Sequence, residues 1–154
     1  MGEQQDEVIL LNMWASFYGM RVMIVLAEKG IQYEYKEEVL RYKSQLLLDM
    51  NPIHKTVSVF IHNDKSICES TIILEYIDDF WNDKAHLFPS DPYAKARAKF
   101  WVDFIDKKLG QVGRKLHTTN REEHEATRKE FIDCLKLLEV ELGDKPYFGD
   151  ENLY

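Results

Sequence analysis

The first eighty residues alternate between two kinds of hydrophobic pattern. Short runs rich in β-branched, aliphatic and tyrosine residues predict strands. These runs lie at residues 8–13, 32–39, 57–61 and 66–68. Apolar residues at helical spacing predict helices, which lie at residues 19–29, 44–50 and 69–80. The predicted order is therefore strand, helix, strand, helix, strand, strand, helix.

The connections between these elements predict how the strands pair. A helical crossover joins the first two strands, and such a crossover implies parallel pairing. The last two strands are separated by the polar residues 62–65, a turn of hairpin length that implies antiparallel pairing. The sequence thus predicts a small mixed sheet with helices packed on it.

From residue 92 onward the pattern is helical throughout. Asp91 suits the N-cap of a first long helix, with a proline at its first position. Asn120 suits the N-cap of a second long helix, which Gly143 ends. We therefore expect three parts: a domain at residues 7–82, a linker at 83–91, and a helical domain at 92–154.

Composition and charge argue against several classes of protein. The 154 residues carry 27 acidic and 20 basic side chains, for a formal net charge of −7, and no basic cluster suits a nucleic acid. The apolar runs are too short to span a bilayer, so no membrane partner is expected. Two cysteines are too few for a disulfide scaffold, and the five histidines lack the spacing of metal ligands. We expect a soluble cytoplasmic protein that binds no metal.

Seven separated motifs follow the order found in one protein family. They are Trp14–Val22, Asn51–Lys55, Ile67–Ser70, Glu75–Asp78, Phe88–Tyr93, Phe100–Lys108 and Gly143–Gly149. Together they resemble the plant tau-class glutathione transferases. The resemblance implies an α+β, thioredoxin-like N-terminal domain (βαβαββα) followed by an all-α helical domain. Because the family normally has several more helices, we expect the helical domain to be incomplete here.

The resemblance also implies a reaction. The thiolate of reduced glutathione attacks small hydrophobic electrophiles, a chemistry of detoxification and stress response. Glutathione is then a co-substrate, and no cofactor is needed. Members of the family are usually cytosolic homodimers, so the expected partners are glutathione, an apolar electrophile and a second copy of the chain.

Ser16 stands just before the first predicted helix, and the resemblance assigns it the activation of the thiol. A free thiol with a pKa of about 8.5 is only a few per cent thiolate at pH 7. Lowering that pKa by about two units needs about 3 kcal/mol. A hydroxyl hydrogen bond to charged sulfur supplies about 1.5–3 kcal/mol, and the helix dipole about 0.5–1 kcal/mol. Without the resemblance, a plain helix N-cap is the simpler interpretation of Ser16.

The resemblance assigns further residues to glutathione binding. They are Phe17, Lys43, Lys55, Val57, Glu69 and Ser70. The two lysines would meet one carboxylate, and Ser70 with the helix N–H groups beside it would meet the γ-glutamyl carboxylate. Glu69 would meet the ammonium, and Val57 would pair main chain to main chain with the cysteinyl part. From the residues alone, the lysines are surface side chains and Ser70 is a helix cap.

The pocket for the electrophile is expected between the two domains. Placement along the chain assigns Met13, Tyr18 and Leu40 to one wall and Arg114 and His117 to the other. A shortened family member that binds glutathione, a ligand or a partner without turnover is the alternative. A glutathione titration beside a conjugation assay separates the two hypotheses.

The Val57–Ser58 pair departs from the family pattern. Glutathione transferases normally carry a cis-proline after an apolar residue before the third strand. A cis bond costs about 0.5–1 kcal/mol before proline but about 2.5–4 kcal/mol before another residue. The sequence therefore favours a trans bond here over the cis alternative.

Overall fold

Residues 6–148 are described in a computed structural model, apart from the side chains of residues 121 and 122. They divide into two compact units, the first ending at His86 and the second beginning at Leu87. The expected domain boundaries around the 83–91 linker stay predictions. The final residues of the expected helical domain, 149–154, lie outside the described residues.

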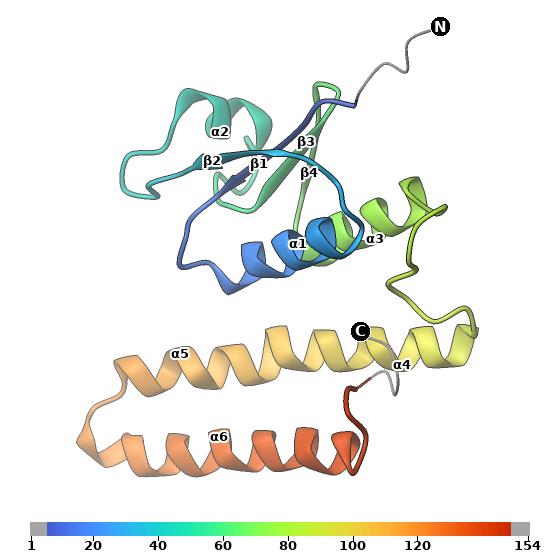
Figure 1. Ribbon diagram of the computed structural model, residues 1–154. Coiled ribbons are helices and arrows are strands. Elements are labelled where there is room, and N and C mark those ends of the chain that lie inside the picture. The colour runs from blue at the N-terminus through green and yellow to red at the C-terminus, as the bar shows by residue number, and fades with distance from the viewer. Residues whose placement is uncertain (1–5, 149–154) are drawn as a thin grey trace, which may run out of the picture. The chain divides into compact units, whose positions relative to one another are not determined.

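The first unit contains the predicted alternation of strands and helices (Figure 1). Its strands are β1 (Val8–Asn12), β2 (Glu34–Glu37), β3 (Val59–His62) and β4 (Lys65–Cys68). Its helices are α1 (Phe17–Glu28), α2 (Gln45–Met50) and α3 (Ser70–Phe80). The predicted order βαβαββα is confirmed, with ends that shift by a few residues.

The four strands form one mixed sheet in the order β2-β1-β3-β4. β1 and β2 are parallel, whereas β3 pairs antiparallel with both β1 and β4. Asn63 and Asp64 both have positive φ, as a tight hairpin turn between β3 and β4 requires. The predicted pairing of the first two and the last two strands is therefore confirmed.

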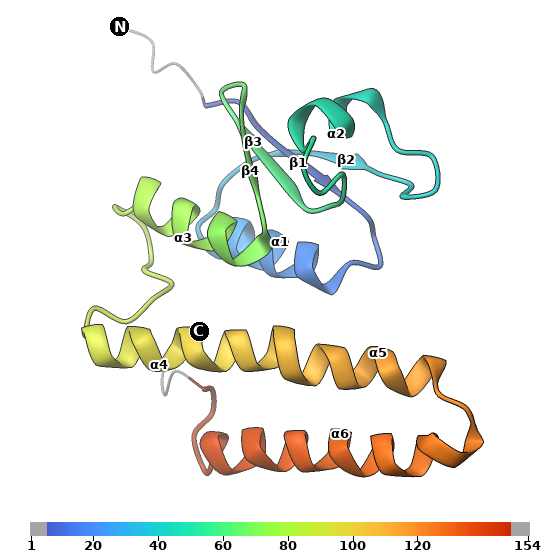
Figure 2. The same ribbon diagram turned by 180° about the vertical axis from the view of Figure 1, so that it is seen from behind.

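Helices cover both faces of this sheet, with α1 and α3 on one side and α2 on the other (Figures 1 and 2). Because successive side chains of a strand point to opposite faces, neighbouring residues of β1 enter different cores. Leu11 packs with Leu47 of α2, while Leu10 is fully buried beside it. Burying both faces explains why β1 and β3 are apolar runs without alternation.

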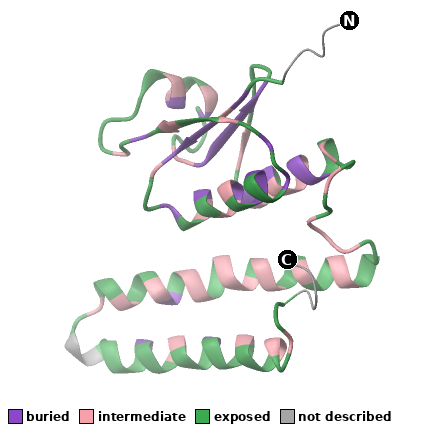
Figure 3. Ribbon diagram, viewed as in Figure 1, coloured by how far each residue is buried: buried purple, intermediate pink, exposed green. Residues whose placement is uncertain are grey.

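The long elements of the second unit are helices within its described residues, and the segments at 87–91, 119–120 and 143–148 are turns or irregular, with an isolated bridge at Tyr147. Its segments are α4 (Pro92–Asp103), the π-helical η1 (Phe104–Leu109), α5 (Gly110–Thr118) and α6 (Arg121–Leu142). The predicted caps are confirmed: the Asp91 side chain accepts from the Ala94 N–H, and the Asn120 side chain from the Glu123 N–H. Few side chains of this unit are buried (Figure 3). Within the described part of the chain, no helix is long and apolar enough to cross a membrane.

Candidate functional site

Ser16 ends the turn that joins β1 to α1, and it is almost fully buried. Its Oγ accepts a hydrogen bond from the Gly19 N–H at 3.2 Å, while its own N–H donates to Met13 O at 2.8 Å. Ser16 is therefore the N-cap of α1. A serine hydroxyl has two acceptor lone pairs and one proton to donate. Capping α1 thus leaves the O–H free to donate to a thiolate, and the two interpretations of Ser16 are compatible.

Asn12, at the end of β1, lies between the start of α1 and the segment before β3. A Cβ built at Gly19 would stand 1.9 Å from Asn12 Oδ1, so only glycine allows α1 to approach the buried amide so closely. The same oxygen accepts a hydrogen bond from Ser58 Oγ at 3.2 Å. Asn12 therefore links the Ser16 turn to the strand segment that carries Val57.

The Val57–Ser58 peptide bond is cis, so the expectation of a trans bond is wrong. Ser58 is buried, and its hydroxyl donates to the buried Asn12 amide. The intrinsic preference of a non-proline peptide bond favours trans. It includes neither this enclosed position nor the hydrogen bond of Ser58.

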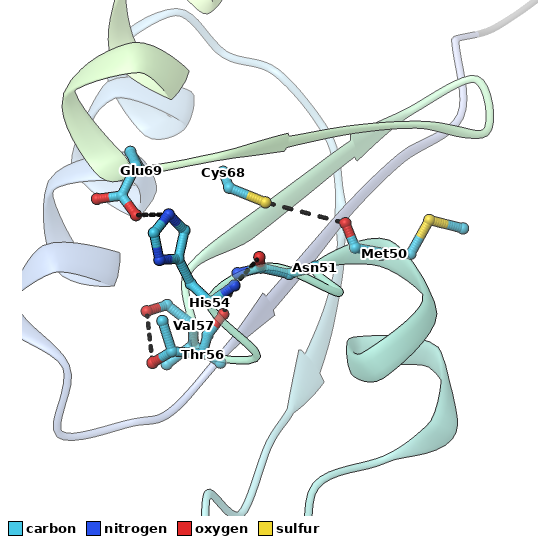
Figure 4. Close-up of polar contacts among 7 residues, drawn as sticks. All are labelled: Met50, Asn51, His54, Thr56, Val57, Cys68 and Glu69. Carbon is cyan, nitrogen blue, oxygen red and sulfur yellow. Dashed lines mark hydrogen bonds and ion pairs between the residues drawn. The ribbon is translucent and has the colours of Figure 1, made fainter.

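Residues 51–57 form a loop, called the 51–57 loop below, that is organised by the Asn51 side chain (Figure 4). Asn51 Nδ2 donates to Thr56 O at 2.9 Å, and Oδ1 accepts from the His54 N–H at 3.1 Å. The Asn51 main-chain oxygen accepts from the Lys55 N–H at 2.9 Å. The loop thereby presents Lys55 and Val57, two of the predicted binding residues.

The start of α3 adjoins this loop. Glu69 is its N-cap, with φ of 70°, and within the described residues it makes no side-chain capping hydrogen bond. The first N–H groups of α3 therefore suit a bound carboxylate. His54 Nε2 lies 3.9 Å from Glu69 Oε1, and Figure 4 shows the imidazole extending from the loop towards that carboxylate. Ser70, the first residue of α3, is buried.

Cys68 is next to this site but does not supply its chemistry. Burial, and then the negative charge of Glu69, raise the pKa of the Cys68 thiol. A raised pKa lowers the thiolate fraction at neutral pH. The Sγ atom lies 3.9 Å from Met50 O. Disulfide exchange at Cys68 is therefore disfavoured.

The other predicted binding residues lie at the edges of this region. Phe17 is exposed at the start of α1, with its ring centroid 4.3 Å from that of Tyr18. Lys43 is exposed and directly precedes Ser44, the N-cap of α2. No ion pair of Lys43 or Lys55 is found among the described residues. Both ammonium groups are thus available for a bound anion.

The residues assigned to the electrophile pocket are not brought together within one unit. Met13 supplies a carbonyl to the Ser16 turn, and Leu40 packs against the core around Leu47. Arg114 and His117 are exposed on α5 in the second unit. This pocket therefore stays a prediction.

Several polar residues that organise the site were not found from the sequence. Besides Asn12 and Asn51, the Glu37 carboxylate accepts from the Trp14 N–H at 3.1 Å. Glu38 is buried and accepts from both the N–H and the hydroxyl of Ser44. The only sequence signals were that Asn12 ends an apolar strand and that Asn51 directly precedes a proline. Each of these signals is too common to identify a site.

Comparison with known proteins adds independent findings. Residues 6–79 match the model of the "Glutathione S-transferase, N-terminal domain". The chain is 62% identical over 148 residues to "Probable glutathione S-transferase parC" of Nicotiana tabacum, covering 96% of the chain and 67% of that relative. It is 58% identical over 146 residues to "Glutathione S-transferase 3" of Glycine max, covering 95% and 67% respectively.

Solved structures agree with these sequence matches. A rice glutathione transferase crystallised in complex with glutathione superposes with a TM-score of 0.91 at 40% identity, over 96% of this chain and 67% of that one. A tau-class glutathione S-transferase from the mango Mangifera indica superposes with a TM-score of 0.90 at 42% identity, over 95% and 69% respectively. The chain thus spans about two thirds of the length of these proteins.

Proposed function

The chain belongs to the tau class of the glutathione S-transferase family, and from this we propose how its first unit performs the transferase reaction. Reduced glutathione binds between the Ser16 turn, the 51–57 loop and the start of α3. Its sulfur, activated as a thiolate, attacks a small hydrophobic electrophile. As the carbon–sulfur bond forms, the electrophile's leaving group departs with its electron pair, or a π-bond opens and takes up a proton from solvent, so that the product is a thioether of glutathione.

The observation that carries the proposal is the Ser16 hydroxyl. It is buried, caps α1 through a lone pair, and keeps a proton to donate. A hydroxyl that accepts one hydrogen bond is polarised and donates more strongly in the second. Together with the N-terminal end of the α1 dipole, this O–H stabilises a thiolate more than a thiol. No general base is needed, since the thiol proton is lost to solvent.

The rest of glutathione is matched by charge and hydrogen bonding. The N–H groups at the start of α3 and the Ser70 hydroxyl donate hydrogen bonds to the γ-glutamyl carboxylate, and Glu69 pairs with the ammonium. The Val57 main chain pairs with the cysteinyl residue. The glycyl carboxylate lies near the ammonium groups of Lys55 and Lys43, with Phe17 beside the bound tripeptide.

Three further parts of the proposal concern the whole protein. The electrophile binds near Met13, Tyr18 and Leu40 of the first unit. The chain works as a homodimer, and it works in the cytoplasm. Placement along the chain supports the first statement, and membership of the family supports the other two.

The test pairs a calorimetric titration of glutathione with a conjugation assay over a panel of electrophiles. Saturable glutathione binding together with turnover of at least one electrophile is expected. Saturable binding without turnover of any electrophile would contradict the transferase proposal and support the alternative of a binding protein. Absence of glutathione binding would overturn both.

A further inference from the structure

Asn51 is a buried polar side chain with no role of its own in the proposed reaction. It is 3% exposed and ends α2, directly before Pro52. Its amide uses one donor and one acceptor on the main chain of the 51–57 loop, at Thr56 O and the His54 N–H. A buried amide is costly unless it is hydrogen-bonded. These bonds both satisfy the amide and fix the path of the loop.

The loop conformation is one that its own residues do not favour. Lys55 has φ of 52°, in the left-handed region that a lysine rarely adopts. Main-chain atoms of Lys55 and of its neighbour Thr56 are tied to Asn51. The Lys55 N–H donates to the Asn51 main-chain oxygen, and Thr56 O accepts from the Asn51 side chain. The amide thus holds Lys55 in a conformation that it would otherwise leave.

We infer that Asn51 is a positioning residue for glutathione, acting through the direction of the Lys55 side chain and the placement of the Val57 main chain. The inference rests on the proposed function, which puts the peptide against both residues. Asn51 has no hydrogen bond to the Ser16 turn, judged over the described residues. Its effect therefore falls on the affinity for glutathione and not on activation of the thiol.

The variant that tests this inference is Asn51→Asp, which replaces the amide nitrogen, a hydrogen-bond donor, by a carboxylate oxygen, an acceptor. The carboxylate still accepts from the His54 N–H but places a second oxygen against Thr56 O, where the amide donates. KM for glutathione should rise about tenfold or more. The kcat and the KM for the electrophile should change less than about threefold.

A pH series adds a signature that general destabilisation would not give. A protonated aspartic acid has one O–H donor and one acceptor, the pattern that Asn51 uses. The ratio of the variant KM to the wild-type KM for glutathione should therefore fall towards one as the pH is lowered from about 7.5 to about 5.5, because burial favours the neutral acid. If Asn51→Asp does not fold, Asn51→Ser takes its place, with the same expected rise in KM at all pH values.

Asn63→Asp is the matched control. Asn63 also uses its amide oxygen on a main-chain N–H, that of Glu7 at 3.0 Å, and its amide nitrogen on an oxygen, Asp6 Oδ1 at 3.0 Å. It lies in the β3–β4 turn, outside the proposed site. Asn63→Asp should lower the melting temperature while leaving KM for glutathione unchanged.

The outcomes separate the inference from the proposed function. Equal glutathione affinity of the wild type and Asn51→Asp overturns the inference and leaves the proposed function intact. A loss confined to kcat, or a KM change matched by Asn63→Asp, also overturns it. A wild-type chain that binds no glutathione overturns the proposed function and the inference with it.

Discussion

At the scale of single residues, the site depends on very close contacts around two amides and one hydroxyl. Ser16 was found from the sequence because it lies in a specific motif just before a helix. The role of Asn12 was not, because it comes from burial and from a contact with a residue 46 positions away. The Asn51–Lys55 motif was found, but not the part that the buried Asn51 amide plays in holding the loop. A pattern of polar and apolar residues carries no information on such contacts.

Gly19→Ala tests the close approach of α1 to Asn12. The added Cβ would stand 1.9 Å from Asn12 Oδ1, so the helix start or the amide must move. The free energy of unfolding should fall by about 1–3 kcal/mol, measured by urea unfolding followed by circular dichroism.

Gly113→Ala is the control for that substitution. Among the described residues, a Cβ there meets only the Phe131 ring, at 3.5 Å, and alanine is favoured over glycine in a helix by about 0.5–1 kcal/mol. The second unit should therefore gain stability. A Gly19→Ala protein as stable as the wild type would show that α1 is not held against Asn12.

At the scale of elements, the order and pairing of strands followed from periodicity and connection length, and the caps from short motifs. Two structural features could not be predicted from these patterns. The first long helical stretch of the second unit contains the π-helical segment η1 and runs on to Thr118, and neither Gly110 nor Gly113 interrupts it. The contact between α1 and α3 includes an ion pair that no local pattern indicates.

Lys29, the C-cap of α1, is buried and its Nζ lies 2.8 Å from Asp78 Oδ1 of α3. The same ammonium donates to the main-chain oxygens of Trp81 and Ala85. Lys29→Met leaves a buried carboxylate without this cation, which should cost about 3–5 kcal/mol. Unfolding of the first unit in urea measures the change.

The exposed pair Lys107–Asp103 provides the comparison, with an N–O distance of 2.6 Å and more than half of each side chain in solvent. Lys107→Met should cost less than about 1 kcal/mol, because solvent screens exposed pairs. Similar losses in the two variants would contradict the assignment of Lys29 as the link between α1 and α3.

At the scale of the whole molecule, the two units differ in how much they bury. The first contains fully buried residues on both faces of its sheet, whereas the described residues of the second bury only Val112, Thr127 and Cys134. Large apolar side chains such as Phe100 and Val140 are 61% and 81% exposed. Elements with few buried apolar contacts have a lower free energy of local unfolding.

Amide hydrogen exchange should therefore be at least about tenfold faster in α4 and α6 than in β1, α1 and α3. A hydrophobic dye should bind the native protein at its exposed apolar surface. Uniform protection across both units, without dye binding, would show that the helices of the second unit are covered in solution.

The central claim is that the Ser16 hydroxyl stabilises the thiolate of bound glutathione. Its most direct test is the pKa of that thiol, titrated by the ultraviolet absorbance of the thiolate in the wild type and in Ser16→Ala. The wild type should lower the pKa by about two units from its free value of about 8.5, and Ser16→Ala should restore at least about one unit of that decrease. Ser16→Thr, which keeps the hydroxyl, should retain the lowered pKa of the glutathione thiol. An equally low pKa in the wild type and in Ser16→Ala would contradict the account.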